Sequence, residues 1–182
     1  MPIVERVARW RVPLGFLFGA AVLWLARPTG TTLAAGAPVA LAGEALRVWA
    51  AGHLNKSREV TSSGPYRWFA HPLYVGSSIM GLGLAIAAGS VTVALMIGLY
   101  LVVTVTAAIK SEEAYLRRTF GERYETYRRG AGGAAPGSRR FSIAQARANH
   151  EQRAIAGVGA ALLLLILKAT YNGLFWRVAA GR

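Results

Sequence analysis

Long apolar segments alternate with short polar stretches along this chain, and most of these segments are long enough to cross the hydrocarbon core of a bilayer. Inside a bilayer no water satisfies the backbone, so each segment is expected to form a helix. The pattern predicts an all-α fold, an integral membrane helical bundle with about five transmembrane helices plus a cytoplasmic amphipathic helix. The segments are Val12 to Ala26, Thr32 to Ala51, Pro72 to Ala88, Val91 to Ile109 and Ala154 to Trp176.

The first segment is short and follows Arg6, Arg9 and Arg11, a pattern that signal peptides share. We interpret it as an uncleaved span, because further spans follow and no clean cleavage site does. Only Gly89-Ser90 separates the third and fourth segments, which predicts a tight helical hairpin.

The stretch from Ser111 to Arg129 is polar but periodic. Its apolar residues recur at helical spacing and form one stripe, from which most of its arginines are absent. This pattern predicts the amphipathic helix on the cytoplasmic membrane surface. Gly130 to Gly137 is expected to be a flexible linker to the last span. The stripe consists of Leu116, Phe120, Tyr124 and Tyr127.

Composition supports a membrane protein folded as a single domain over residues 1–182. The chain is 54% hydrophobic and 16% charged, whereas soluble domains carry about 25% charged residues. It contains no cysteine, which excludes disulfides, thiolate metal sites and thiol catalysis. No metal site is expected, because His53, His71 and His150 lie far apart in the sequence.

Basic residues predict the orientation. The net charge is +13, and ten of the 21 basic residues lie between Lys110 and Arg153. The positive-inside rule therefore places the amino terminus and both polar clusters described below in the cytoplasm. Such a patch more often faces anionic lipid than nucleic acid, and no nucleic-acid-binding motif accompanies it.

The first polar cluster is Gly64 to Gly76 (GPYRWFAHPLYVG), at the mouth of the third segment. Pro72 suits the first turn of a helix, so His71 is expected at its cap, with Tyr74 on the same face. Tyr66 precedes them in a Gly-Pro turn. A capping histidine within an interfacial aromatic belt would explain the same residues without chemistry.

The second polar cluster is Glu112-Glu113, at the exit of the fourth segment. Glu112 shares the apolar stripe, where a carboxylate is costly without a partner. The alternative is an acid favoured by the helix dipole, with Glu113 simply solvated. We expect the two clusters to meet at the membrane surface and form one site. Glu44 and Arg47 are also expected to pair, either as a functional or as a self-neutralised pair.

These residues resemble the isoprenylcysteine carboxyl methyltransferase and phospholipid methyltransferase superfamily of integral membrane enzymes. The resemblance runs from about Leu46 to Arg129 and rests on three matches in order: TSSGPY at 61–66, HPLYVG at 71–76, and EE at 112–113 followed by FGERYETY at 120–127. It implies that S-adenosylmethionine binds at the cytoplasmic face. The residues it implies around this cofactor are Arg58, Glu59, Val60, Thr61, Tyr66, His71, Pro72, Leu73, Tyr74 and Glu112.

The chemistry of these side chains agrees with that assignment. Aromatic faces and a carboxylate stabilise a sulfonium cation. Methyl transfer is an in-line displacement in which most of the catalysis can come from positioning, so no enzyme nucleophile is required. A carboxylate acceptor arrives ionised, whereas an amine or hydroxyl needs a base, for which Glu112, His53 and Glu59 are the candidates.

The acceptor stays open at this point. An isoprenylcysteine-like carboxylate leads on family resemblance, although Ala108 stands where the prenylcysteine enzymes carry an arginine. A membrane lipid amine follows closely. In either case membrane lipids surround the protein and the amphipathic or prenylated substrate enters sideways from the bilayer. Two other hypotheses remain: a membrane reductase using NADPH, and a non-catalytic adaptor whose basic face recruits anionic partners.

Overall fold

A computed structural model of the chain describes residues 15, 17–55, 59–130 and 140–173, which form helices and short connections without a strand in those ranges. Residue 15 and residues 17–25 are helical, and we call this segment the first helix. The elements that follow are α2 (Gly30–His53), the 3-10 helix η1 (Gly64–Arg67), α3 (Pro72–Ala88), α4 (Val91–Phe120), α5 (Glu122–Arg128), α6 (Ile143–Ala148) and α7 (Gln152–Tyr171).

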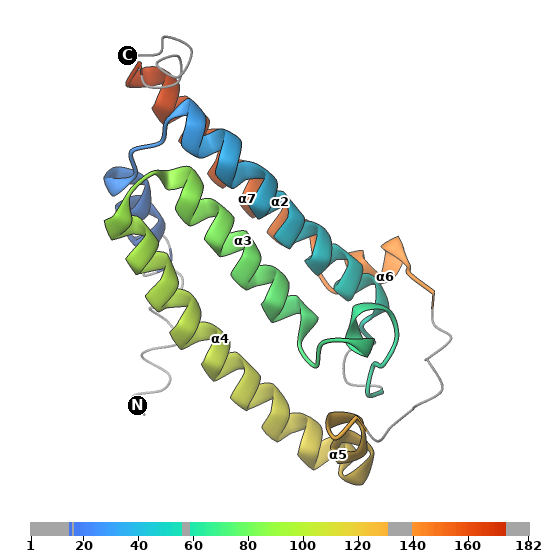
Figure 1. The fold of residues 1–182 in the computed structure, drawn as a ribbon. Helices are drawn as coiled ribbons and strands as arrows, with labels where there is room; N and C mark the ends of the chain where they lie inside the picture. Colours follow the sequence, from blue (N-terminus) through green and yellow to red (C-terminus); the bar gives the residue numbers. More distant parts are fainter. Residues whose placement is uncertain (1–14, 16, 56–58, 131–139, 174–182) are drawn as a thin grey trace, which may run out of the picture.

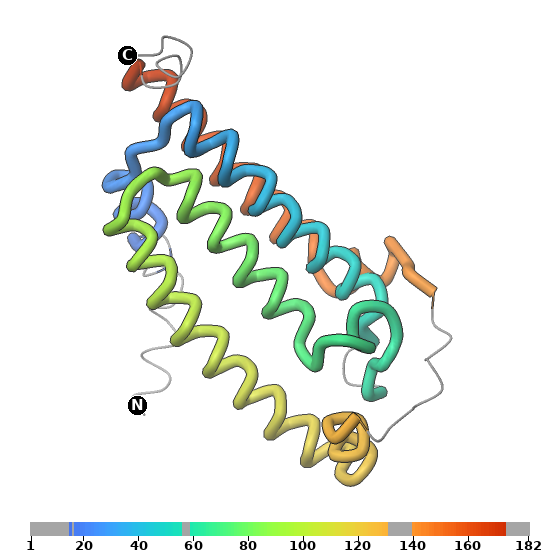
Figure 2. The backbone as a smooth tube through the Cα atoms, in the orientation of Figure 1, coloured from blue at the N-terminus to red at the C-terminus, as the bar shows by residue number. Residues whose placement is uncertain are grey.

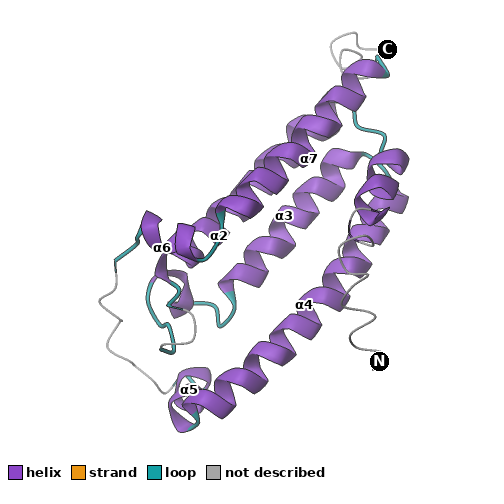
Figure 3. Cartoon of the chain, turned by 180° about the vertical axis from the view of Figure 1, so that it is seen from behind, coloured by secondary structure: helices purple, strands orange, loops and turns teal. Residues whose placement is uncertain are grey.

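The long helices lie side by side as a bundle (Figure 1). α3 lies between α2 and α4, and α7 packs along α2. The views from the front and from behind agree that η1, α5 and α6 gather at one end of the bundle (Figure 3). We call this end the polar end; the turn between α3 and α4 lies at the opposite end.

Glycines let α2 and α3 approach each other closely. A Cβ at Gly43 would lie 2.6 Å from the carbonyl oxygen of Gly76, and one at Gly83 would lie 2.7 Å from that of Gly36. Real Cβ atoms do not come so close to a carbonyl oxygen, so these positions require glycine. Small residues at regular helical spacing are typical of helix pairs packed in membranes. This contact holds α3, which carries His71 and Tyr74, firmly against α2.

The hairpin predicted between the third and fourth segments is confirmed. α3 ends at Ala88, Gly89 adopts a left-handed conformation with φ of 61°, and the hydroxyl of Ser90 accepts a hydrogen bond from the backbone of Val93. Glycine is favoured at such a helix end because it has no Cβ. At the other end of α3, His71 is the N-cap residue and Pro72 begins the helix, as expected.

The amphipathic helix expected over Ser111 to Arg129 is wrong in its boundaries. α4 continues without interruption from Val91 to Phe120, and the chain turns at Gly121, with φ of 50°, into the separate α5. The tube drawing shows α5 as a short coil at the end of this long helix (Figure 2). The change from apolar to polar residues near Lys110 is therefore a change of surroundings rather than a helix boundary.

α6 closes the end of α2, and the sequence did not predict it. The Nδ2 of Asn149 donates to the carbonyls of Ala51 and Leu54 at 2.8 and 2.9 Å, and Gln145 Nε2 donates to Leu54 at 2.9 Å. The last carbonyls of a helix lack intrahelical partners, and these side chains supply them. α6 therefore fixes the start of α7 against the polar end.

A buried ion cluster joins α7 to α2 and α3. Arg47 Nε lies 3.5 Å from Glu44, which confirms the predicted pair, but only 2.8 Å from Glu151 at the start of α7. These contacts are ion pairs whose angles fall outside those of hydrogen bonds. Arg47 also donates to the hydroxyl of Ser77 in α3. Glu44 and Glu151 are both 5% exposed, so one arginine offsets two buried carboxylates.

α4 and α7 are long and apolar enough to cross a membrane, and α3 is a shorter apolar helix. In the most apolar window only 6% of α4 and 22% of α7 is buried inside the protein, so their apolar side chains face outward. Large exposed apolar surfaces of this kind are typical of sites that contact a membrane or another protein. Of the first predicted span, residues 12–14 and 16 lie outside the described residues, as do Trp176, the linker from 131 and Arg58.

Candidate functional site

His71 brings the two predicted clusters together. Its Nδ1 lies 3.6 Å from a carboxylate oxygen of Glu112, and its Nε2 lies 3.4 Å from one of Glu113. Pro72 begins α3, so the cap position holds the imidazole at the mouth of the helix, opposite α4. Glu113 is thus a member of the site rather than a solvated neighbour. Its side chain is 21% exposed, against 37% for Glu112.

Three tyrosines lie near Glu112. Tyr74 forms a side-chain hydrogen bond with Glu112, and its ring lies 5.8 Å from that of His71. Tyr66 in η1 is 8% exposed; burial foremost, and then the nearby charge of Glu112, raises the pKa of Tyr66. Burial and the charge of Glu112 likewise raise the pKa of Tyr124 in α5. A carboxylate with tyrosine side chains nearby is suited to a cationic ligand.

α5 is fastened over η1 by hydrogen bonds that the sequence did not predict. The hydroxyl of Tyr127 donates to the backbone carbonyl of Tyr66 at 2.8 Å, and Arg128 forms an ion pair with Glu113. Tyr124 is 1% exposed, and its hydroxyl has no hydrogen-bond partner among the described residues. A buried hydroxyl without a partner is unusual, and a bound polar molecule would satisfy it.

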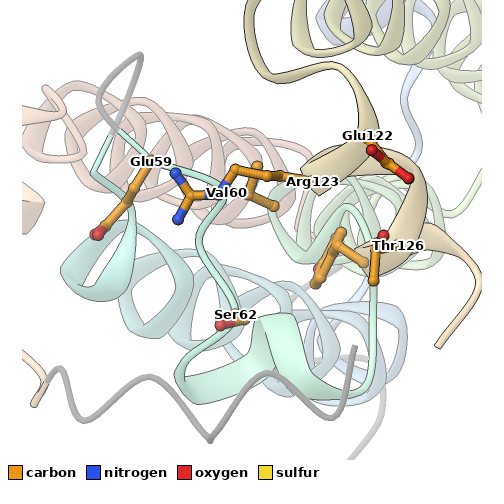
Figure 4. A pocket seen from close by; sticks show the side chains of 7 residues that line it. Glu59, Val60, Ser62, Glu122, Arg123 and Thr126 are labelled. Carbon is orange, nitrogen blue, oxygen red and sulfur yellow. The ribbon is translucent and has the colours of Figure 1, made fainter. Parts of the chain in front are cut away.

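A pocket of about 530 Å³ opens between the loop after α2 and α5. Figure 4 shows Arg123 extending from α5 toward the side where Glu59 and Val60 lie. The volume falls in the range of about 300–1,000 Å³ that small-molecule sites occupy. We call it the polar pocket. It is lined by Glu59, Val60, Ser62, Glu122, Arg123, Thr126 and Tyr127.

A larger pocket of about 830 Å³ lies among the long helices, and we call it the apolar pocket. Its walls come from the first helix, α3, α4 and α7, and nearly all of its lining residues are apolar or small. It reaches along α3 from Tyr74, beside Glu112, to Ala88 at the opposite end. At about 1.5 Å rise per residue this is roughly 21 Å, comparable to a long hydrocarbon chain.

The residues around Glu112 lie between these two pockets. Tyr127 lines the polar pocket, and its hydroxyl donates to the backbone carbonyl of Tyr66. Tyr66 is close enough to Glu112 for the charge of that carboxylate to help raise the pKa of Tyr66. Glu112 in turn contacts Tyr74, which lines the apolar pocket. Neighbouring residues around Glu112 therefore link a polar cavity at the polar end with an apolar cavity among the helices.

The other predicted site residues have different surroundings. His53 is buried; its Nδ1 lies 3.0 Å from the carbonyl of Trp49, and its ring packs against Gly64 and Phe141. These contacts fit a packing role beneath η1. Thr61 is also buried, and its hydroxyl accepts a hydrogen bond from the backbone of Asn55. Of the predicted residues, Glu59 and Val60 line the polar pocket.

Comparisons with known proteins decide the family. A family model described as phospholipid methyltransferase matches residues 40–123, which contain His71, Tyr74, Glu112 and Glu113. The chain is also 35% identical to a protein-S-isoprenylcysteine O-methyltransferase of Schizosaccharomyces pombe, over 48% of this chain and 37% of that protein. This chain belongs to the isoprenylcysteine carboxyl and phospholipid methyltransferase superfamily. The predicted family is therefore confirmed.

Two further relatives of this superfamily member carry names from metal resistance. The chain is 30% identical to a nickel-cobalt-cadmium resistance protein of Alcaligenes xylosoxydans xylosoxydans, over 69% of this chain and 62% of that protein. It is 29% identical to a cobalt-zinc-cadmium resistance protein of Cupriavidus metallidurans, over 69% and 61%. The chain thus spans from about a third to three fifths of the length of these curated relatives. No solved structure matches it significantly.

Proposed function

We propose that this protein is a multi-pass membrane methyltransferase that transfers a methyl group from S-adenosylmethionine to an amphipathic acceptor. The observation that carries the proposal is the position of Glu112 between the polar and the apolar pocket, with His71, Tyr66 and Tyr74 around it. Family membership supports the reaction class. The concentration of basic residues beside the site supports a cytoplasmic position for the polar end and for the amino terminus.

The side chains of the polar end fit the proposed cofactor. S-adenosylmethionine supplies an electrophilic methyl group on a sulfonium sulfur. Glu112 and its tyrosines offer the negative charge and aromatic faces that favour such a cation. Glu59 and Arg123 at the polar pocket offer both signs of charge, as an amino acid moiety requires. The hydroxyl of Tyr124, without a partner among the described residues, is a free donor for this ligand.

The apolar pocket is the proposed acceptor site. An apolar tail would lie along α3 and leave the head group next to Tyr74 and Glu112. The residues of this chain would then align the two reactants and exclude water. Most of the rate enhancement of methyl transfer can come from such positioning. Glu112 is the group best placed to receive a proton from an acceptor that loses one, whereas the contacts of His53 argue against a direct role.

The two candidate acceptor classes differ in their head group, which is either a carboxylate or an amine. Likeness to the isoprenylcysteine enzyme supports a carboxylate. The side chains favour an amine instead, because no basic residue lines the apolar pocket in the described part of the chain, and Ala108 lies in its wall. Arg47 donates a hydrogen bond to Ser77 in this wall, but Glu44 and Glu151 already offset the positive charge of Arg47. A negatively charged head group would therefore find no counter-charge there.

Methyl transfer in membranes containing the protein tests the proposal. Radiolabelled S-adenosylmethionine is supplied with either a farnesylated cysteine analogue or phosphatidylethanolamine, and label in the lipid phase is counted. We expect incorporation, greater with the amine, and loss of it in Glu112→Gln. Glu125→Gln, which removes a carboxylate paired with Arg117 outside both pockets, is the matched control. Oxidation of NADPH without methyl transfer would instead support the reductase hypothesis.

A further inference from the structure

Lys168, near the end of α7, is a charged residue that follows the apolar run of residues 154–167, and its partners lie on the first helix. Its Nζ donates to the backbone carbonyl of Leu23 at 2.6 Å and to that of Trp24 at 2.7 Å. These residues lie 145 and 144 positions earlier in the chain. The side chain therefore joins two helices that are distant in sequence.

The place of these carbonyls explains why a lysine is needed. The first helix ends at Leu25, and the carbonyls of its last turn lack intrahelical partners. The amide of Ala26 satisfies the carbonyl of Val22, and Lys168 satisfies the next two. A cation is also favoured at the negative end of a helix dipole. In an apolar environment, where water is scarce, these hydrogen bonds hold the helix end in place.

The first helix forms a wall of the apolar pocket. Six of the described lining residues belong to it, and Phe18 stacks on Tyr100 of α4 with ring centroids 4.9 Å apart. Both rings line the pocket. The first helix thus closes the pocket between α4 and α7, while Lys168 fastens the end of this helix to α7. The six residues are Gly15, Phe18, Gly19, Ala20, Val22 and Leu23.

We propose that Lys168 is a positioning residue that holds the first helix as a wall of the apolar pocket, and thereby sets the affinity for the apolar part of the acceptor. The part of this inference that concerns the acceptor rests on the proposed function; the part that concerns the helix does not. Donor binding, at the polar end of the bundle, is expected to be independent of Lys168.

Crosslinking tests the helix independently of any activity. The chain contains no cysteine, so F18C and Y100C introduce a unique pair where the two rings stack. We expect a short bismaleimide to join them efficiently in the otherwise native protein. Adding Lys168→Met should lower the yield several-fold, whereas Lys168→Arg, which keeps the donors, should preserve it. An unchanged yield in Lys168→Met would overturn the proposal.

Kinetics tests the acceptor. Lys168→Met should raise the KM for the acceptor by about tenfold, equivalent to one good charged hydrogen bond, with the Kd for S-adenosylmethionine unchanged. Lys168→Arg should restore the KM. Leu167→Met, at an exposed neighbouring position of α7, is the control for altered helix packing. Equal losses of donor and acceptor affinity would indicate general destabilisation and refute the positioning role. If neither the native protein nor any variant binds S-adenosylmethionine, the proposed function fails. The crosslinking result still reports whether Lys168 holds the first helix in place.

Discussion

The hydroxyl of Tyr127 donates a hydrogen bond of 2.8 Å to the backbone carbonyl of Tyr66, 61 residues earlier in the chain. Tyr66 lies in η1, beside the HPLY motif, and Tyr127 lies in α5. This bond joins the turn at the start of the first polar cluster to the short helix that follows α4. The polar pocket lies between α5 and the loop that leads into η1, so its shape depends on this contact.

Tyr127→Phe removes the bond while keeping the ring. We expect the affinity for S-adenosylmethionine to fall by about 0.5–1.5 kcal/mol, the usual worth of one hydrogen bond. Calorimetric titration measures it. Tyr171→Phe, at the exposed end of α7 and outside both pockets, is the control for loss of a hydroxyl. Unaltered affinity in Tyr127→Phe would mean that α5 is held without this bond.

Alkaline pH should loosen the same contact. Burial raises the pKa of Tyr127 from 10.0 to about 12. A pKa raised on folding stabilises the folded state fully below pH 10, and this contribution is lost as pH rises through 12. Thermal unfolding in detergent between pH 10 and 12 should therefore show a smaller decline for Tyr127→Phe than for the native protein. An equal decline in stability for the two proteins would contradict a stabilising role of the Tyr127 hydroxyl. Tyr66 and Tyr124, whose pKa values are also raised, lower the stability of both proteins in the same pH direction.

The ion cluster around Arg47 should respond asymmetrically to substitution. Arg47→Met leaves Glu44 and Glu151 buried without their counter-charge, and we expect it to destabilise the protein by about 3–5 kcal/mol. Glu44→Gln removes the surplus negative charge and should leave stability unchanged or raise it. Denaturant titration followed by circular dichroism compares the two. Equal destabilisation by both variants would show that Glu44 contributes an attraction of its own.

Filling the apolar pocket should affect the acceptor alone. Gly157 lines this pocket, and a Cβ there meets no atom within 4 Å, so Gly157→Leu projects into the cavity without a clash. We expect a higher KM for the acceptor and an unchanged Kd for the donor. Gly159→Leu, equally open but outside the lining, controls for the helix stabilisation of roughly 0.5–1 kcal/mol that loss of a glycine brings. Identical acceptor KM values in the two variants would place the acceptor elsewhere.

Local signals predicted much of the fold. Gly89-Ser90 marked the hairpin and Pro72 marked the start of α3, because both act through backbone geometry. The end of α4 was placed too early, since residues after Lys110 change polarity but remain good helix formers until Gly121. α6 was missed because its six residues are too few to show a helical period. Glu151, the second carboxylate beside Arg47, and the two carbonyls bound by Lys168 are more than 100 positions away from their partners, beyond the reach of local patterns.

The candidate site was predicted in outline for a similar reason. His71 and Glu112 each stood out, and their contact follows from the antiparallel hairpin of α3 and α4. Glu113 was underestimated, because a histidine lying between two adjacent positions of a helix can reach both, and only coordinates reveal this. Tyr124 and Tyr127 appeared merely as members of an apolar stripe. The turn at Gly121 brings α5 back over η1 and gives them their contacts.

Titration of S-adenosylmethionine into the detergent-purified protein by calorimetry tests the central claim most directly, with Glu112→Gln and the control Glu125→Gln alongside. The account predicts saturable binding to the native protein and to the control. It predicts a loss of about 1–3 kcal/mol, up to roughly a hundredfold in Kd, for Glu112→Gln. Absence of binding to a folded native protein would contradict the methyltransferase proposal, and equal affinity in all three would remove Glu112 from the site.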